Sequence, residues 1–332
     1  RKMGYSMSPR PGWYKSFEWS GYVPFEEMPY LYNPPEGYIS TANNKTIGNE
    51  FPYYISGLWA DPSRSSRIKE FLEEDKKFSL EDMKALQLDL TSNYSKEILP
   101  AILKNAGTYE SPIFNRAIQF LNDWNHIENI DSEGTLIFHS ISNEIIRNIY
   151  YDELSVLGDK YFETYIGLKY ITKRNLRRIL KSHTNKWVDD IRTPNKNETI
   201  DEIITKSIES GIRKVVDTYG PNWSNWKWGS AHSLTHKHIL GDIKILNYLF
   251  NLNIGPFLSG GSDVTPNAGG YSLHKGFNQT SGASMRRIVD FSDLNKTNMI
   301  LPTGQSGLHD SPHYSDQAPL YHKGKYLSLI HI

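Results

Sequence analysis

The sequence predicts an α+β protein in which strand-rich ends flank a helical middle region. The prediction depends on three zones that differ in residue composition and in the spacing of their apolar residues. Residues 1–60 and 230–332 combine turn-forming Pro and Gly with short apolar segments, as strands and loops do. Residues 61–229 contain one helical pattern after another. We therefore expect a strand and loop segment, a helical region, and a C-terminal strand and loop segment that returns to the core beside the first.

The first zone contains few helical patterns and one short candidate strand. The strand is Gly37–Ser40, which follows Asn-Pro-Pro and precedes Asn-Asn after two residues. Asn and Pro are typical of turns, so they define the ends of the segment.

The second zone carries two helix starts of the capping-box type. Ser79–Asp82 has Asp in place of the usual Glu or Gln, and Thr199–Glu202 fits the pattern fully. After the second box, apolar residues recur at gaps of three and four, which predicts one buried helical stripe. The stripe consists of Ile200, Ile203, Ile204, Ile208, Ile212, Val215 and Val216.

The third zone returns to turns and short strands. Arg287–Phe291 and Asn298–Leu301 read as two strands joined through the turn Asp293–Lys296. We expect them to pair as a hairpin.

Composition limits the possible functions. The 332 residues include 37 basic and 37 acidic side chains, so the formal net charge is zero and a nucleic-acid footprint is disfavoured. The absence of cysteine excludes disulfides and thiolate metal sites. No apolar run is long enough to span a membrane.

The stretch at residues 303–317 gathers Ser306, His309, Asp310 and His313, which suggests a Ser-His-Asp centre. A nucleophile elbow needs Gly-x-Ser-x-Gly between a strand and a helix, but here the second Gly comes one residue early. Triad members also usually converge from distant parts of a chain. We therefore interpret the stretch as an ordered loop whose Gly and Pro residues set backbone angles.

A metal site is a second possibility, at the histidines of WGSAHSLTHKH. His232 and His236 stand four residues apart, a spacing that binds zinc from one helix face. The catalytic base of that motif is missing, because Ser, Leu and Thr lie between them. A structural role is favoured, and the sequence assigns no metal ligand.

Two further features have alternative interpretations. The glycine pairs Gly260-Gly261 and Gly269-Gly270 match no phosphate loop and indicate tight turns. Asn43-Asn44 is either a turn or an amide donor aimed at a developing oxyanion. Spacing alone favours the turn.

Five segments, in order along the chain, resemble motifs of the penicillin acylase family of N-terminal-nucleophile amidohydrolases. They are FEWSGYVPFEEMP (17–29), NPPEGYISTANN (33–44), WKWG with His232, GASMRRIVD (282–290, with Ala283 where the family has Pro) and GQSGLHDSPHYSDQ (304–317). The last one identifies residues 303–317 as a recurrent loop of the family.

The resemblance implies an αββα sandwich and a precursor that is cut to expose a serine at the start of the β-chain. This chain resembles only the later part of that β-chain, so we expect a fragment that is inactive alone because its nucleophile lies outside it. In the whole enzyme the serine attacks an amide carbonyl and its own α-amine accepts the proton.

By resemblance, three residues take catalytic roles. Asn43 takes the oxyanion-hole position, and Arg67 matches an Arg that orients this Asn, with Arg64 as a neighbour that also fits. Asp290 is a candidate for orienting the N-terminal amine. No cofactor is needed for the chemistry, and a structural calcium is possible in the whole enzyme.

The resemblance leaves the substrate open. The leading hypothesis is a penicillin acylase-like enzyme that cleaves an N-acyl amide. The alternatives are an acyl-homoserine-lactone acylase of the same family, or a non-catalytic homologue acting as a binding module. The expected partners are a small acyl amide and the rest of the precursor, namely the α-chain and the N-terminal part of the β-chain. Only the family suggests a periplasmic or extracellular location.

Overall fold

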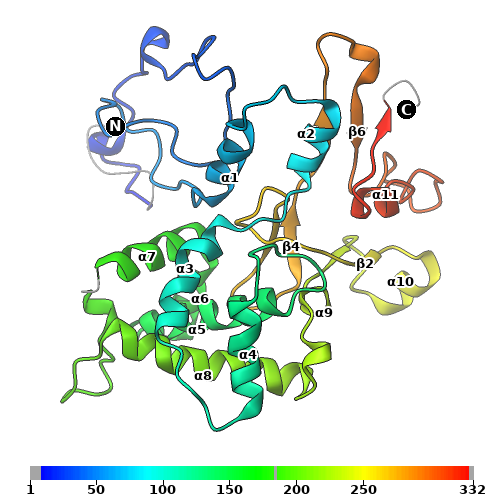
Figure 1. Cartoon of the computed structure of the whole chain (residues 1–332). Coiled ribbons are helices and arrows are strands. Elements are labelled where there is room, and N and C mark those ends of the chain that lie inside the picture. The colour runs from blue at the N-terminus through cyan, green and yellow to red at the C-terminus, as the bar shows by residue number, and fades with distance from the viewer. Residues whose placement is uncertain (1–8, 183–184, 329–332) are drawn as a thin grey trace.

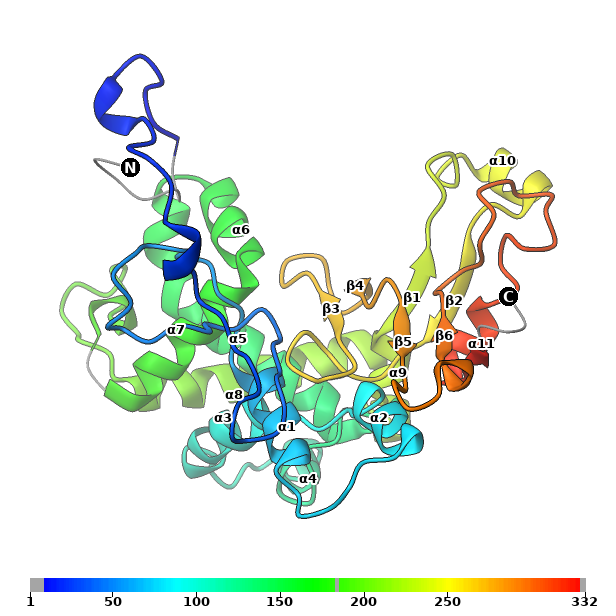
Figure 2. The same ribbon diagram turned by 90° about the horizontal axis from the view of Figure 1, so that it is seen from above.

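The chain combines a helical lobe with two small sheets (Figure 1). The computed structural model describes residues 9–182 and 185–328. Figure 2 shows α5–α7 toward one side and β1, β2, β5 and β6 toward the other, with α2 below β5. The structure is therefore α+β, as the sequence predicts.

The elements have the following bounds. The helices of the first two zones are α1 Ser63–Leu72, α2 Leu80–Gln87, α3 Asn93–Lys104, α4 Pro112–Asn122, α5 Glu133–Val156, α6 Asp159–Gly167, α7 Lys169–Ser182 and α8 Ile200–Tyr219. Shorter helices are α9 Trp228–Ala231, α10 Lys244–Phe250 and α11 Ala318–His322. The 3₁₀ helices are η1 Lys15–Phe17, η2 Phe25–Glu27, η3 Lys186–Val188, η4 Trp223–Asn225 and η5 Leu294–Lys296. The strands are β1 Ser233–His236, β2 Ile254–Leu258, β3 Gly269–Tyr271, β4 Gln279–Gly282, β5 Arg286–Ile288, β6 Asn298–Ile300 and β7 Leu327–Ser328.

The core of the helical lobe is the crossing of α5 and α8. The predicted stripe of α8 is buried as expected, with only Val216 partly exposed. The two backbones approach closely at Gly211, where an added Cβ atom would lie 2.8 Å from the Cα atom of Ile141. Ser140 donates a hydrogen bond to the carbonyl oxygen of Gly211 at 2.8 Å, which fixes the crossing.

Both capping boxes form as predicted. The Ser79 side chain accepts from the backbone N–H of Asp82, and the Asp82 carboxylate accepts from the Ser79 backbone N–H at 2.8 Å. Thr199 and Glu202 make the same reciprocal pair at the start of α8. Local side-chain chemistry therefore decides where these helices begin.

The two sheets are built from residues 233–328. The first has four strands in the order β2-β1-β4-β3, and its β1–β4 pair is parallel. The second has the order β5-β6-β7 and is antiparallel. Its β5–β6 hairpin confirms the predicted strand pair, and the 3₁₀ helix η5 lies in its connection.

The N-terminal zone differs from the prediction. Gly37–Ser40 forms no strand, because no other described segment pairs with it. Within the described residues, this zone supplies loops and the helices η1 and η2. Its apolar side chains include Tyr22 and Phe25, which are exposed. The described part of the chain contains no helix that is both long and apolar enough to cross a membrane.

Candidate functional site

Asn43 lies in a tight bend between the N-terminal zone and α1. Its φ angle of 61° is left-handed, a conformation that Asn tolerates better than most residues. Its carbonyl oxygen accepts a hydrogen bond from the backbone N–H of Ala60 at 2.8 Å. The backbone is therefore a turn, as the spacing favours, while the side chain remains exposed.

Arg64 holds this side chain. Its Nη2 atom donates to Asn43 Oδ1 and to the carbonyl oxygen of Ala42, each at 2.9 Å. Because the carboxamide oxygen is occupied as an acceptor, the Nδ2 group of Asn43 is oriented away from the guanidinium as a donor. The arrangement presents an amide N–H group of fixed orientation.

Arg67, the residue that the sequence assigns to this contact, has other partners. Its Nε atom lies 2.6 Å from Asp89 Oδ2, and its Nη1 atom lies 3.5 Å from Glu70 Oε2. Positions three residues apart lie near one face of a helix, so both arginines were candidates from sequence. In the structure, Arg64 makes the contact with Asn43 and Arg67 does not. The catalytic roles of all three residues stay predictions.

Among the described residues, no hydrogen bond or ion pair connects Asp290 with Asn43. Its carboxylate accepts from the hydroxyl and the backbone N–H of Ser292 at 2.6 and 2.9 Å. These hydrogen bonds lower the pKa of Asp290 below its ordinary value. Asp290 therefore organises the turn after β5, and its role at an N-terminal amine stays untested.

Helix α7 carries four cations at four-residue spacing, and the first three of them contact distant parts of the chain. Arg177 donates to Asp61 Oδ1 at 3.1 Å. Lys173 forms an ion pair with Asp263, and both side chains are buried. Lys169 Nζ lies 3.3 Å from the hydroxyl of Ser281 on β4. One helix face thus connects the start of the helical region, at Asp61, with the C-terminal zone.

Lys169, at the start of α7, is partly buried. Burial lowers the pKa of Lys169; the Asp263 charge opposes this effect, and the charges of Lys173 and Arg64 add to it. Burial therefore disfavours the charged form of Lys169.

The motif WKWG with His232 forms part of the core. The Trp228 ring stacks between the imidazoles of His139 and His232, with centroid distances of 4.7 and 4.6 Å. His139 Nε2 also lies 3.2 Å from Glu128 Oε1 in a buried pair. These contacts support the structural interpretation of the motif.

The two histidines considered as zinc ligands have different partners. His232 Nδ1 lies 2.5 Å from the carbonyl oxygen of Phe277, and His236 Nε2 lies 3.2 Å from Nε2 of His322. In residues 9–182 and 185–328, no three His, Asp or Glu side chains form a group that could hold a metal.

The C-terminal loop contains no triad in its described geometry. Ser306 Oγ accepts from the backbone N–H of Leu308 at 3.1 Å, while His313 Nδ1 lies 2.9 Å from Asp316 Oδ2. The backbone N–H of Ser306 also donates to the carbonyl oxygen of His313 at 3.0 Å, which closes the loop. These contacts are those of an ordered loop, which is the structure expected from the sequence.

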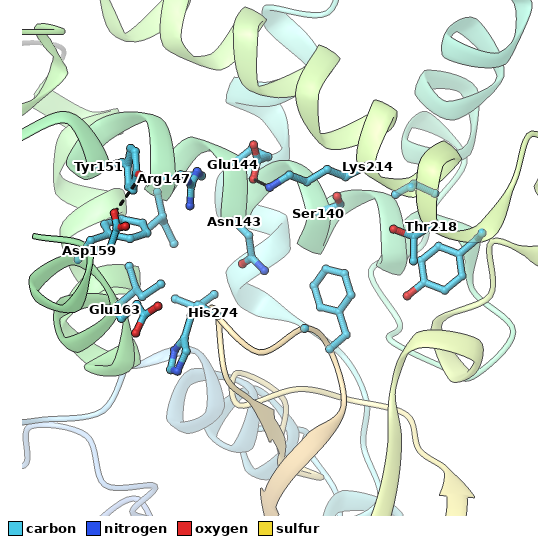
Figure 3. Close-up of a pocket in the computed structure, with 18 residues that line it drawn as sticks. Ser140, Asn143, Glu144, Arg147, Tyr151, Asp159, Glu163, Lys214, Thr218 and His274 are labelled. Carbon is cyan, nitrogen blue, oxygen red and sulfur yellow. Dashed lines mark hydrogen bonds and ion pairs between the residues drawn. The ribbon is translucent and has the colours of Figure 1, made fainter. Parts of the chain in front are cut away.

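Two hollows lie away from Asn43. One of about 680 Å³ is bounded by α5, α6, α8 and the loop between β3 and β4, and its rim carries the Tyr151–Asp159 and Lys214–Glu144 contacts (Figure 3). The other, of about 750 Å³, follows β1 and β4. Neither is lined by Asn43 or Arg64, so the site rests on the contacts of those residues.

Sequence reasoning missed the α7 cations and the buried acids Glu128 and Asp263. The spacing of Lys169, Lys173 and Arg177 was a readable signal of one helix face. Their partners were not readable, because Asp263 is 90 residues from Lys173.

The comparisons with known proteins agree with the motifs. The sequence matches the family described as penicillin amidase over residues 1–331. An acyl-homoserine lactone acylase of Pseudomonas fluorescens is 26% identical over 348 residues, covering 99% of this chain and 41% of that protein. The penicillin acylase 2 proenzyme of a Pseudomonas species is 25% identical, covering 93% of this chain and 38% of that protein.

A solved structure shares the fold. The thermostable penicillin G acylase of Alcaligenes faecalis superposes with a TM-score of 0.55 at 15% identity, over 94% of this chain and 57% of that chain. The chain spans 41% of the length of the acyl-homoserine lactone acylase and 38% of the length of the penicillin acylase 2 proenzyme, which is less than half in each case.

Proposed function

The chain belongs to the penicillin amidase family, and from that premise we propose that it is part of an amidohydrolase that cleaves an N-acyl amide. The chain covers 41% of a related acylase, so the remaining machinery would come from further sequence. We place the nucleophilic N-terminal serine, the α-chain and the N-terminal part of the β-chain in that remainder.

The proposal is supported chiefly by the contact between Arg64 and Asn43. Attack of a serine hydroxyl on an amide carbonyl creates a tetrahedral oxyanion, which is stabilised by hydrogen-bond donors that are oriented in advance. Arg64 occupies the Oδ1 atom of Asn43, so the Nδ2 group is available as such a donor. The positive charge of the Arg64 guanidinium favours the same anion.

In this scheme, the α-amine of the N-terminal serine transfers the protons. An α-amine has an ordinary pKa near 8, so it can accept the serine proton near neutral pH and deliver it to the leaving amine. Water would then hydrolyse the acyl ester. In this scheme, the described residues orient and stabilise, and the nucleophile transfers the protons.

Two readings of the substrate follow from the relatives. The first is a penicillin acylase-like amide, and the second is an acyl-homoserine lactone, which the name of the first relative favours. A non-catalytic binding module is the contrasting class. It predicts that the mature protein has no Ser, Thr or Cys at the processed N-terminus, which mass spectrometry of that terminus would show.

A structural calcium remains a proposal for the whole enzyme. The described residues gather no group of three acidic or histidine side chains to hold it. The scheme accordingly routes no step through a metal ion.

The test is Asn43→Ala in the full-length protein, assayed for release of the amine from an acyl amide. Removing one oxyanion donor typically lowers kcat by about 10²–10³-fold. Asn49→Ala is the matched control, because Asn49 is exposed on the same loop and contacts Lys45. Unchanged kcat in Asn43→Ala would remove Asn43 from the oxyanion role.

A further inference from the structure

One buried carboxylate beside Asn43 takes no part in the proposed chemistry. Asp61 is only 3% exposed. It follows Ala60, whose backbone N–H donates to the carbonyl oxygen of Asn43, and it stands three residues before Arg64, which holds the side chain of the same residue. Burying a charged group is unfavourable unless the group is paired, so a carboxylate between these two contacts requires an explanation.

The Asp61 carboxylate shapes the start of α1. Its Oδ1 atom accepts from the backbone N–H of Ser63 at 3.0 Å and from the Ser63 hydroxyl. The first N–H groups of a helix have no partner within the helix, and a carboxylate is a favourable acceptor at that end. Pro62, the N-cap residue, provides no side-chain hydrogen bond, so Asp61 serves in its place. The carboxylate therefore defines where the helix that carries Arg64 begins.

Arg177 fixes this carboxylate to the helical lobe. Its Nε atom lies 3.0 Å from Asp61 Oδ2, and its Nη2 atom donates to Asp61 Oδ1 at 3.1 Å. Its Nη1 atom pairs with Glu97 of α3. A pair with two contacts restricts orientation as well as distance. The position of the start of α1 is thus set by α7 and α3.

The bend at Asn43 needs such support. Its φ angle of 61° lies in the left-handed region, which is unfavourable for a residue other than Gly and persists only where the surrounding structure holds it. The hydrogen bonds that hold it come from Ala60 and Arg64, and both residues lie within three positions of Asp61. A change at Asp61 therefore reaches Asn43 through its backbone and through its side chain.

We propose that Asp61, fixed by Arg177, is a positioning residue for the oxyanion donor Asn43. It places Ala60 and Arg64, and these two residues orient the Asn43 amide. The inference rests on the proposed amidohydrolase function and adds two residues to its machinery. Since Asp61 acts through Asn43 in this scheme, its loss should lower kcat with little change in KM, and only while the Asn43 amide is present.

The test is a double-mutant cycle in the full-length protein. Wild type, Asp61→Asn, Asn43→Ala and the double variant are assayed for kcat and KM on one acyl amide that wild type cleaves, chosen from penicillin G and a set of N-acyl-homoserine lactones. Asparagine at position 61 keeps an oxygen for the Ser63 N–H group but loses the charge that pairs with Arg177. The substitution therefore isolates the contact with α7.

Gly211→Ala is the matched control for a general loss of stability. It disturbs the crossing of α5 and α8, where Gly211 contacts Ile141 and Ser140, and neither of these residues lies in the bend. Assays are run under conditions in which urea unfolding shows every variant to be folded, and Gly211→Ala should then keep the wild-type kcat. If Asp61→Asn does not fold, Arg177→Lys takes its place in the cycle, because lysine keeps the charge but lacks the guanidinium fork.

We expect Asp61→Asn to lower kcat by about 10- to 10²-fold in the wild-type background, since a misplaced catalytic group costs up to about this factor. In the Asn43→Ala background it should cause no further loss. Unchanged kcat in Asp61→Asn, the same fold loss in both backgrounds, or an equal loss in Gly211→Ala overturns the inference, while the loss in Asn43→Ala leaves the amidohydrolase proposal standing. If wild type cleaves none of the acyl amides, or if Asn43→Ala keeps full turnover, the proposed function or its oxyanion donor fails, and the inference falls with it.

Discussion

Arg64 and Asn43 lie 21 residues apart in sequence and share a hydrogen bond of 2.9 Å between Nη2 and Oδ1. The same Nη2 atom also binds the carbonyl oxygen of Ala42, so one guanidinium fixes both the backbone and the side chain of the bend. The orientation of the Asn43 amide is therefore set by α1 and not by the loop alone.

The first prediction is that Arg64→Lys lowers turnover. Lysine keeps the charge, but its flexible ammonium lacks the rigid guanidinium plane that holds Nη2 against both oxygens, so the Asn43 amide loses its fixed orientation. A small displacement of this kind can cost about 10²-fold in kcat. Arg67→Lys is the matched control, because Arg67 pairs with Asp89 instead. A larger kcat loss in Arg67→Lys than in Arg64→Lys would return the orienting role to Arg67.

The second prediction concerns the crossing of α5 and α8. Gly211→Ala places a Cβ atom 2.8 Å from Cα of Ile141, so the two helices must move apart. Overpacking of this kind costs about 1–3 kcal/mol of unfolding free energy. Urea unfolding measures the loss, and Gly107→Ala is the control because nothing lies within 4 Å of its added Cβ. Equal stability of the two variants would contradict the close approach.

The third prediction concerns the ion pair of Lys173 and Asp263. Lys173→Met leaves the Asp263 carboxylate buried without its partner, which typically costs about 3–5 kcal/mol. The double variant Lys173→Met/Asp263→Leu should regain most of this loss, because neither charge remains. Lys181→Met on the same helix removes an exposed cation and should cost less than about 1 kcal/mol. Comparable urea midpoints for Lys173→Met and Lys181→Met would refute the prediction.

The fourth prediction is a loss of stability in acid that depends on His232. Burial lowers the pKa of His232 from 6.5 to about 4, although its contact with the Phe277 carbonyl opposes the shift. Between pH 6.5 and about 4, His232 is protonated in the unfolded chain and neutral in the folded chain. Stability is thus complete above about pH 6.5 and falls as the pH drops toward 4.

His232→Gln should remove this contribution and flatten the curve by up to about 1.4 kcal/mol per pH unit. His236 and His322 also have lowered pKa values, but both remain in the variant and cancel in the comparison. Urea unfolding at several pH values gives the two slopes. Parallel slopes would exclude His232 as a source of acid sensitivity.

Features with local causes could be predicted from sequence. The start of α8 follows from the Thr199–Glu202 box, and its buried face follows from the spacing of its isoleucines. The β5–β6 hairpin was also readable, because its two strands lie next to each other in the chain. In these cases, the residues that decide the structure are neighbours in sequence.

Features that need distant partners could not be predicted. Gly37–Ser40 resembles a strand in composition, but a strand also needs a neighbour to pair with. The choice between Arg64 and Arg67 depends on where Asp89 lies, and three residues of separation on one helix cannot decide it. The contact that Lys169 makes depends on Ser281, more than a hundred residues away.

The face of α7 has a thermodynamic consequence. Lys169, Lys173 and Arg177 attach one rigid helix to Ser281, to Asp263 and to Asp61. A displacement of α7 would break contacts to the start of the helical region and to the C-terminal zone at once, so the two sets of contacts are energetically coupled. The boundary in composition near residue 230 therefore does not separate two independent units, and we expect the helical region and the C-terminal zone to unfold in one cooperative transition.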